Sequence, residues 1–243
     1  MHPKPWSPHG RALLDFFHGK ASAEVVVHDE DGYTDVIPAR VFFRAGEEFS
    51  ALEEAALDLC RGRVLDAGAG AGCHSLALQE RGLAVCAIDI AAEAVEVMRG
   101  RGVRDARRAD IFRFRAEPFD TLLLLMNGIG VVGRVAGVRP FLSTLGRLLQ
   151  PGGQILLDSF DPRPEDGAGA VAPGNPRRPR RYIGEMRFQL EYEGRKGEMY
   201  DWLFVDFETL AGQAKAAGWV AASIWHEEEG HYLARLTRAG RTA

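Results

Sequence analysis

The fold of this chain is decided by one stretch, Val64-Leu65-Asp66-Ala67-Gly68-Ala69-Gly70-Ala71-Gly72. It reads as a buried strand, a glycine-rich turn and the start of a helix in immediate succession. Such a succession binds cofactors, because the first N–H groups of the helix face the ligand. Glycine suits the turn because it adopts positive φ and lets a ligand lie against the backbone.

Two details of this stretch separate two kinds of cofactor. Dinucleotide enzymes use a Gly-x-Gly-x-x-Gly turn for a pyrophosphate, which requires a third glycine at position 73 if it starts at Gly68. Cys73 stands there, whereas Gly72 completes a Gly-x-Gly-x-Gly turn. Asp66 is also unfavourable beside a pyrophosphate, but it suits a ligand with an ammonium and a sulfonium group, such as S-adenosylmethionine.

Strands and helices alternate on both sides of this stretch. The apolar pattern predicts strands at 63–67, 84–89, 119–126 and 154–159, and helices at 73–81, 92–100 and around 141–149. We expect Pro151-Gly152-Gly153 to end the last of these helices and turn into the next strand. A helix at 207–217 and strands at 219–226 and 231–237 follow, the last two as an antiparallel hairpin. The pattern predicts a Rossmann-like, doubly wound, mostly parallel α/β sheet.

The chain is expected to be a single domain with additions to this core. Residues 1–60 form an N-terminal prefix that covers the site, with a helix near Leu13, a hairpin at 24–28 and 33–37, and a helix after the Ser50/Glu53 capping box. Residues 61–160 form the cofactor-binding core. Residues 161–205 hold a flexible Pro-, Gly- and Arg-rich loop (161–181) and two inserted strands, and residues 206–243 close the fold.

The run from Val64 to Gly72 resembles the first motif of class I S-adenosylmethionine-dependent methyltransferases, and Leu148 to Gly153 resembles their later helix-to-strand turn. The resemblance implies a seven-stranded sheet and S-adenosylmethionine as cofactor. It also implies that Asp89 accepts hydrogen bonds from both ribose hydroxyls, and that Asp110 and Ile111 hold the adenine. The cofactor-binding residues expected on this basis are Asp66, Ala67, Gly68, Ala69, Gly70, Gly72, His74, Asp89, Ile90, Asp110, Ile111, Met126, Asn127 and Gly128.

Some of these positions have a purely structural alternative. Asp110 can cap a local turn, and Asn127 can be a turn former before Gly128. His74 either approaches the methionine end of the cofactor or covers the first turn of its helix. Tyr33 and the segment 42–44 either cover the cofactor or belong to the core.

Other polar clusters are interpreted in the same way. His226 and His231 are five residues apart and flank a glycine turn, which favours a hairpin over a zinc motif, and no metal site is expected. The arginines of the loop either steer an anionic substrate or are simply solvated; they are Arg177, Arg178, Arg180 and Arg181.

Composition limits the partners. The chain has 30 basic and 34 acidic side chains, a formal charge of -4, so we expect neither nucleic acid nor an anionic membrane as a partner. No run reaches the roughly 18 apolar residues of a membrane span, and the N-terminus lacks an apolar secretory core, which predicts a cytoplasmic protein. The three cysteines are expected to be reduced core thiols.

The predicted function is therefore methyl transfer to an unidentified acceptor, for which a small molecule is preferred. No motif identifies a catalytic base or an oligomeric state. Two alternatives stay open: an NAD(P)-dependent oxidoreductase on a related fold, and a non-catalytic S-adenosylmethionine-binding protein.

Overall fold

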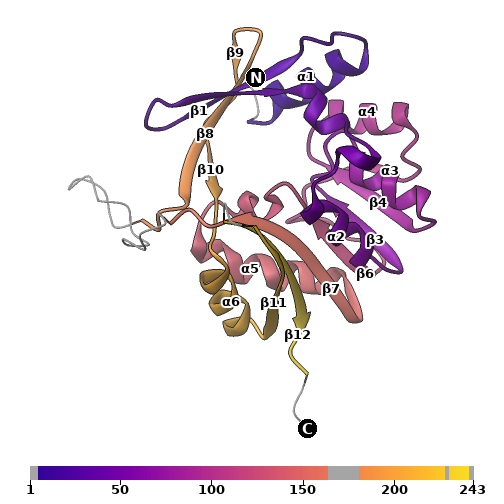
Figure 1. Cartoon of the computed structure of the whole chain (residues 1–243), viewed down its shortest axis with the longest axis vertical. Helices are drawn as coiled ribbons and strands as arrows, with labels where there is room; N and C mark the ends of the chain where they lie inside the picture. The colour runs from indigo at the N-terminus through magenta and orange to yellow at the C-terminus, as the bar shows by residue number, and fades with distance from the viewer. Residues whose placement is uncertain (1–4, 164–180, 228–229, 241–243) are drawn as a thin grey trace.

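Two β-sheets organise the chain in a computed structural model that describes residues 5–163, 181–227 and 230–240. One is a seven-stranded sheet and the other a five-stranded antiparallel sheet, which arches over one edge of the first (Figure 1). None of the helices in the described ranges is long and apolar enough to cross a membrane.

The seven-stranded sheet has the order β11-β12-β7-β6-β3-β4-β5. Its strands are β3 (Arg63–Ala67), β4 (Ala84–Asp89), β5 (Ala106–Arg108), β6 (Phe119–Leu124), β7 (Leu149–Phe160), β11 (Trp219–His226) and β12 (His231–Arg238). Strands β3 to β7 pair in parallel, and β12 pairs antiparallel with both β7 and β11. The predicted Rossmann-like sheet with an antiparallel C-terminal hairpin is confirmed.

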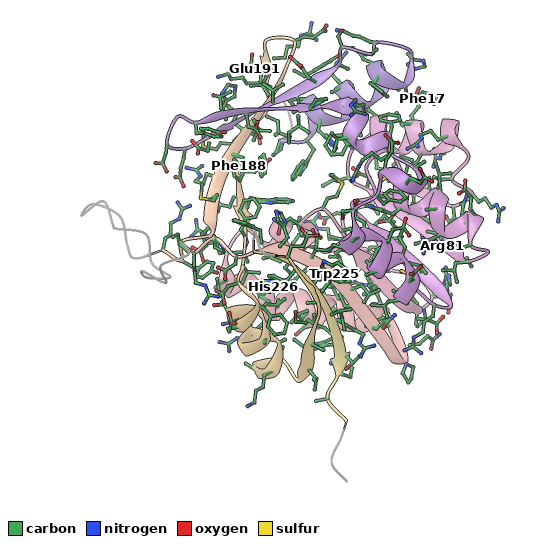
Figure 2. All side chains as sticks on the ribbon, in the orientation of Figure 1. Phe17, Arg81, Phe188, Glu191, Trp225 and His226 are labelled. Atoms are coloured by element: carbon green, nitrogen blue, oxygen red, sulfur yellow. The ribbon has the colours of Figure 1, made fainter. Side chains whose placement is uncertain are left out.

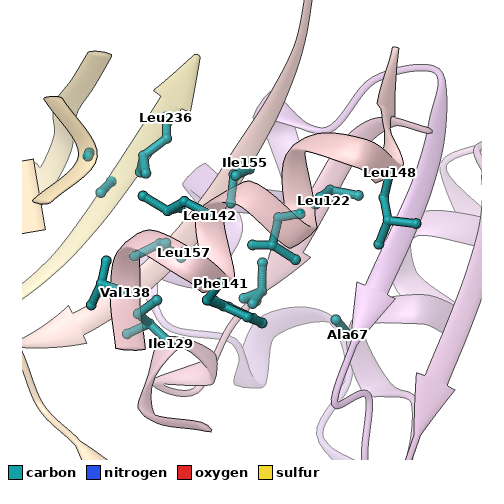
Figure 3. Close-up of a cluster of buried hydrophobic side chains, with 14 of the residues drawn as sticks. Ala67, Leu122, Ile129, Val138, Phe141, Leu142, Leu148, Ile155, Leu157 and Leu236 are labelled. Atoms are coloured by element: carbon teal, nitrogen blue, oxygen red, sulfur yellow. The ribbon is translucent and has the colours of Figure 1, made fainter. Parts of the chain in front are cut away.

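Helices cover both faces of this sheet because its strands are apolar on both sides. On β3, Val64 packs into the cluster under α2 (Ala51–Leu59) and α3 (Cys73–Glu80). Its neighbour Leu65 packs on the opposite face, in the cluster under α5 (Val135–Leu145) and α6 (Phe207–Ala216), part of which Figure 3 shows. Helix α4 (Ala92–Arg101) covers the β4 and β5 end of the α3 face.

The five-stranded sheet joins the two additions to the core. It has the order β10-β8-β1-β2, with β9 paired to β8. Its strands are β1 (Glu24–Asp29), β2 (Thr34–Pro38), β8 (Glu185–Tyr192), β9 (Arg195–Lys196) and β10 (Tyr200–Leu203). The predicted N-terminal hairpin and inserted strands both exist, but they pair with each other, with Val27 opposite Leu190. Prefix and insertion are therefore one structural unit.

The five-stranded sheet together with α1 (Ser7–Phe17), called the arch below, is attached to the core at both ends (Figure 1). At one end α1 packs on α4, and at the other β10 packs against the short helix η3 (Gly128–Val132), which follows β6. The segment between β2 and α2 forms two further short helices, η1 (Ala39–Phe43) and η2 (Gly46–Glu48). The arch thus stands over the carboxyl ends of the parallel strands.

Two predicted boundaries were wrong. The turn expected at Pro151-Gly152-Gly153 lies inside β7, because α5 is already ended by η4 (Gly146–Leu148), and a register shift between β6 and β7 absorbs the extra residues. Strand β6 ends at Leu124 because Met126 and Asn127 both take positive φ, 58° and 57°.

The predicted loop 161–181 falls mostly outside the described residues, as do Arg177, Arg178 and Arg180. Arg181 forms a salt bridge with Glu30 of the β1–β2 turn. The three cysteines, Cys60, Cys73 and Cys86, are buried free thiols, as predicted.

Candidate functional site

The parallel strands bring the predicted residues to one edge of the sheet. Asp66 lies on β3, Asp89 ends β4, Asp110 follows β5, and Met126 follows β6. In open α/β sheets, ligands bind at this carboxyl edge, where the strand order reverses. Here the reversal falls between β3 and β6, next to the glycine loop.

The glycine loop presents open backbone at two of its three glycines. Gly68 and Gly70 have φ of +79° and +55°, and a Cβ added at either one would meet no atom within 4 Å. Gly72 differs, because a Cβ there would lie 2.9 Å from Val103 and 3.0 Å from Met98. The first two glycines leave room for a ligand, whereas Gly72 allows close packing on α4 and its following turn.

Asp89 is fixed by backbone donors. Its Oδ2 accepts a hydrogen bond from the Gly70 N–H at 3.0 Å, and its Oδ1 accepts one from the Ala91 N–H at 2.8 Å. The carboxylate is 9% exposed and each oxygen retains a lone pair for a further donor. This geometry suits two adjacent hydroxyl groups of a ligand.

A buried charged cluster lies beside the loop. Asp66 accepts a hydrogen bond from Ser75 Oγ at 2.6 Å, and burial raises the pKa of its carboxyl. His74 Nε2 lies 2.8 Å from Glu53 Oε1, and the Arg44 guanidinium donates to both Glu53 oxygens at 2.7 Å. Arg44 also reaches Met126 Sδ at 3.9 Å, so the cluster extends to the end of β6.

The pKa values in this cluster favour an ion pair. Burial opposes the charge of Glu53, but hydrogen bonds from His74 and Arg44 outweigh it and lower its pKa to about 2. Burial likewise opposes the charge of His74, but Cys73 and Glu53 raise its pKa to about 10. His74 is therefore an imidazolium held by Glu53, which agrees with a structural role more than with direct cofactor contact.

The end of β7 adds a carboxyl that the sequence did not indicate. Asp158 is buried, and burial raises its pKa to about 7. Its Oδ1 accepts the Asn127 N–H at 2.9 Å. The Asn127 side chain is itself occupied, since it accepts from Ser159 Oγ at 2.8 Å and donates to the Leu203 carbonyl at 3.1 Å. The Asn127 side chain thus links β7 to β10.

The remaining predicted residues are placed less centrally. Asp110 Oδ1 accepts the Phe112 N–H at 2.9 Å, which is the turn cap named as its alternative. Ile90 is 42% exposed, and Ile111 packs at the rim of the core under α5. Tyr33 is 68% exposed in the hairpin turn, and Phe42 packs with α1 and α4.

Two residues at this edge were missed by the sequence interpretation: Glu53 and Asp158. Arg44 lies in the segment 42–44, which was expected either to cover the cofactor or to belong to the core, but its pairing with Glu53 was not expected. The Ser50/Glu53 capping box is present, but Glu53 also pairs with Arg44 and His74, a role that the box does not indicate. No local pattern marks Asp158, because it reads as part of the strand Gln154 to Ser159.

A family model described as a methyltransferase domain matches residues 65–157. The crystal structure of a SAM-dependent methyltransferase from Bacteroides fragilis, in complex with S-adenosyl-L-homocysteine, is 40% identical, with a TM-score of 0.86, covering 98% of this chain and 97% of that chain. This chain belongs to the SAM-dependent methyltransferases. The predicted family is confirmed, and the alternative of a nicotinamide-dependent oxidoreductase does not agree with this similarity.

Other proteins are similar to this chain over a shorter stretch or at lower identity. The ubiquinone biosynthesis O-methyltransferase of Xanthomonas oryzae pv. oryzae is 32% identical over 124 residues, 48% of this chain and 51% of that enzyme. The chain therefore spans about half the length of the curated relatives it matches. CalS10, an amino pentose methyltransferase from Micromonospora echinaspora, is 21% identical with a TM-score of 0.55, covering 79% of this chain and 93% of that one, and shows the fold alone.

The residues present fit the family's cofactor. The open backbone at Gly68 and Gly70 accommodates a ligand against the loop, and Asp89 offers two anchored oxygens for a diol. Asp66 and Asp158 add two buried carboxyl groups at this edge, which attract a cationic ligand when they are ionised.

Proposed function

We propose that the chain binds S-adenosylmethionine at the carboxyl edge of its seven-stranded sheet and transfers the methyl group to a small-molecule acceptor held under the arch. The observation that carries the proposal is the anchored carboxylate of Asp89 beside the open glycine loop. Asp89 would accept hydrogen bonds from the ribose hydroxyls, and Asp110 with Ile111 would hold the adenine. The loop from Asp66 to Gly70 would lie against the methionine part.

When bound, S-adenosylmethionine supplies a methyl group activated by a positively charged sulfur, and the sulfur keeps the electron pair of the S–C bond when the methyl group is transferred. The chain's contribution is to align the acceptor with that methyl group and to exclude water. Asp158 would take the proton of the attacking acceptor, because it is buried next to the turn after β6 and has a pKa of about 7.

The acceptor surface is inferred from the inner side of the arch. Trp202 on β10 lies directly on Gly130 of η3, where an added Cβ would be 2.2 Å from the indole. The rings of Trp6 and Tyr200 lie 4.6 Å apart and those of Trp6 and Trp202 5.5 Å apart, and all three side chains are partly exposed. Phe188 continues this aromatic row along β8 (Figure 2). Such a surface suits a small acceptor with an aromatic or apolar body.

Calorimetry with S-adenosylmethionine, S-adenosylhomocysteine and NAD tests cofactor choice. We expect the first two to bind, Asp89→Asn to weaken both at least tenfold, and Asp105→Asn, the same change at the other end of the neighbouring strand, to leave binding unchanged. Binding of NAD alone would overturn the proposal.

A panel of small phenols, amines and thiols, read by formation of S-adenosylhomocysteine, then tests transfer. Turnover with one acceptor class supports an enzyme. Cofactor binding without turnover on any small molecule, protein or nucleic acid supports the non-catalytic alternative.

A further inference from the structure

Helix α1 carries His9 at the corner where α1 packs on α4. The next residue, Gly10, packs on the segment that follows Asp89: a Cβ added there would lie 3.2 Å from Ala91 Cβ and 3.1 Å from Glu93 Oε2. The backbone of α1 at Gly10 therefore lies in close contact with the turn between β4 and α4. Figure 1 shows α1 against α4 at this corner of the molecule.

The His9 ring has a nitrogen without a partner. Nε2 is buried and forms no hydrogen bond with any described residue, while the ring packs edge-on against Phe42 with centroids 4.6 Å apart. A buried polar atom without a partner costs about 1–3 kcal/mol, and folded proteins contain few of them. Such an atom indicates a ligand group when a binding residue lies beside it.

The segment that follows Asp89 packs on this part of α1, with Ala91 against Gly10. Burial lowers the pKa of His9, and the negative charge of Asp89 acts on the ring in the opposite direction. The ring is therefore neutral near pH 7, with one nitrogen as donor and the other as acceptor. The two Asp89 oxygens are already oriented by the N–H groups of Gly70 and Ala91.

We propose that His9 is a cofactor-binding residue whose Nε2 hydrogen-bonds a ribose hydroxyl that Asp89 also holds. The proposal rests on the proposed function, because it takes the ribose as the group at Asp89. A hydroxyl fits this position since it donates to the carboxylate while its oxygen accepts from Nε2–H. The N-terminal helix then forms one wall of the ribose site, and the prefix is needed for cofactor affinity as well as for covering the acceptor.

The test is calorimetry with S-adenosylhomocysteine and its 2′-deoxy and 3′-deoxy ribose analogues, on wild type, His9→Phe, His9→Gln and the control His18→Phe. His18 is exposed at the end of the same helix. We expect His9→Phe to weaken S-adenosylhomocysteine about tenfold, as for one lost hydrogen bond, and to leave one deoxy analogue unaffected. His9→Gln, which retains an amide near the position of Nε2, should restore part of the preference for the hydroxyl.

A His9→Phe protein that binds all three ligands as wild type does, or that weakens all three by one factor, overturns the proposal. Calorimetry on Asp89→Asn distinguishes the proposed ribose site at Asp89 from the proposed contact of His9. If Asp89→Asn loses affinity and His9→Phe does not, the ribose site stands without His9. If wild type binds no S-adenosylhomocysteine, both proposals fail.

Discussion

Glu53 and His74 form a buried ion pair between α2 and α3, with 2.8 Å from Oε1 to Nε2, and Arg44 closes it from the other side. Both side chains of the pair are less than a tenth exposed. Removing one partner from such a pair leaves a buried charge uncompensated, which costs more than the pair contributes. The cluster thus holds the first turn of α3 in place, and with it the end of the glycine loop, because α3 begins directly after Gly72.

Replacement of Glu53 by glutamine should destabilise the protein by about 3–5 kcal/mol, because His74 and Arg44 lose their common counter-charge. Urea denaturation followed by circular dichroism measures this. The matched change Glu54→Gln removes an exposed partner of Arg81 and should cost no more than about 1 kcal/mol. Equal effects of the two changes would show that the buried pair has no special weight.

The same pair predicts a dependence of stability on pH. The pKa of His74 is raised from 6.5 to about 10 in the folded protein, so its contribution is fully present below pH 6.5 and is lost as pH rises through 10. The free energy of unfolding should therefore fall between pH 6.5 and 10. His74→Gln should be less stable near pH 6 and should show a smaller fall over this range; an unchanged fall would assign it to other groups.

Substitution of Asp158 should stabilise the protein, in contrast to substitution of Glu53 or His74. Its pKa is raised from 3.8 to about 7, so its charge destabilises the folded state progressively as pH rises through this range. Asp158→Asn should raise the unfolding free energy by about 1–4 kcal/mol at pH 8 and have little effect at pH 4. Denaturation curves at both pH values measure this, and the same gain at both would contradict an origin in charge.

The glycine loop can be tested against a distant glycine with the same backbone. Gly70 and Gly82 both have positive φ, +55° and +83°, and both leave open space where a Cβ would lie. Alanine at either position should cost about 1 kcal/mol of stability. Gly70→Ala should also weaken S-adenosylhomocysteine at least tenfold in calorimetry, whereas Gly82→Ala, in the turn between α3 and β4, should not. Equal affinities would place the ligand away from the loop.

Trp202 provides a test of the acceptor surface once an acceptor is known. Trp202→Ala should raise the KM for the acceptor about tenfold, because a large apolar contact is lost, and leave cofactor affinity unchanged. Tyr33→Ala, which removes the exposed aromatic ring of the β1–β2 turn, should change neither quantity. A loss of cofactor affinity in Trp202→Ala would indicate a structural role.

The sequence by itself determined the glycine loop, the alternation of strands and helices, the closing hairpin and the position of Asp89. These features depend on residues that are neighbours in the chain, where periodicity and turn chemistry act locally. The same local signals predicted the hairpin at β1 and β2 and the inserted strands β8 and β10. They did not indicate that the two would pair.

Only the tertiary structure decided which distant groups meet. Val27 pairs with Leu190, Arg44 and His74 both bind Glu53, and the Asn127 amide is held by Ser159 and the Leu203 carbonyl. Such contacts are selected by the packing of whole elements: unpaired strand edges must find hydrogen-bond partners, and buried charges must find counter-charges, wherever the fold brings them. No local pattern in the sequence carries that information.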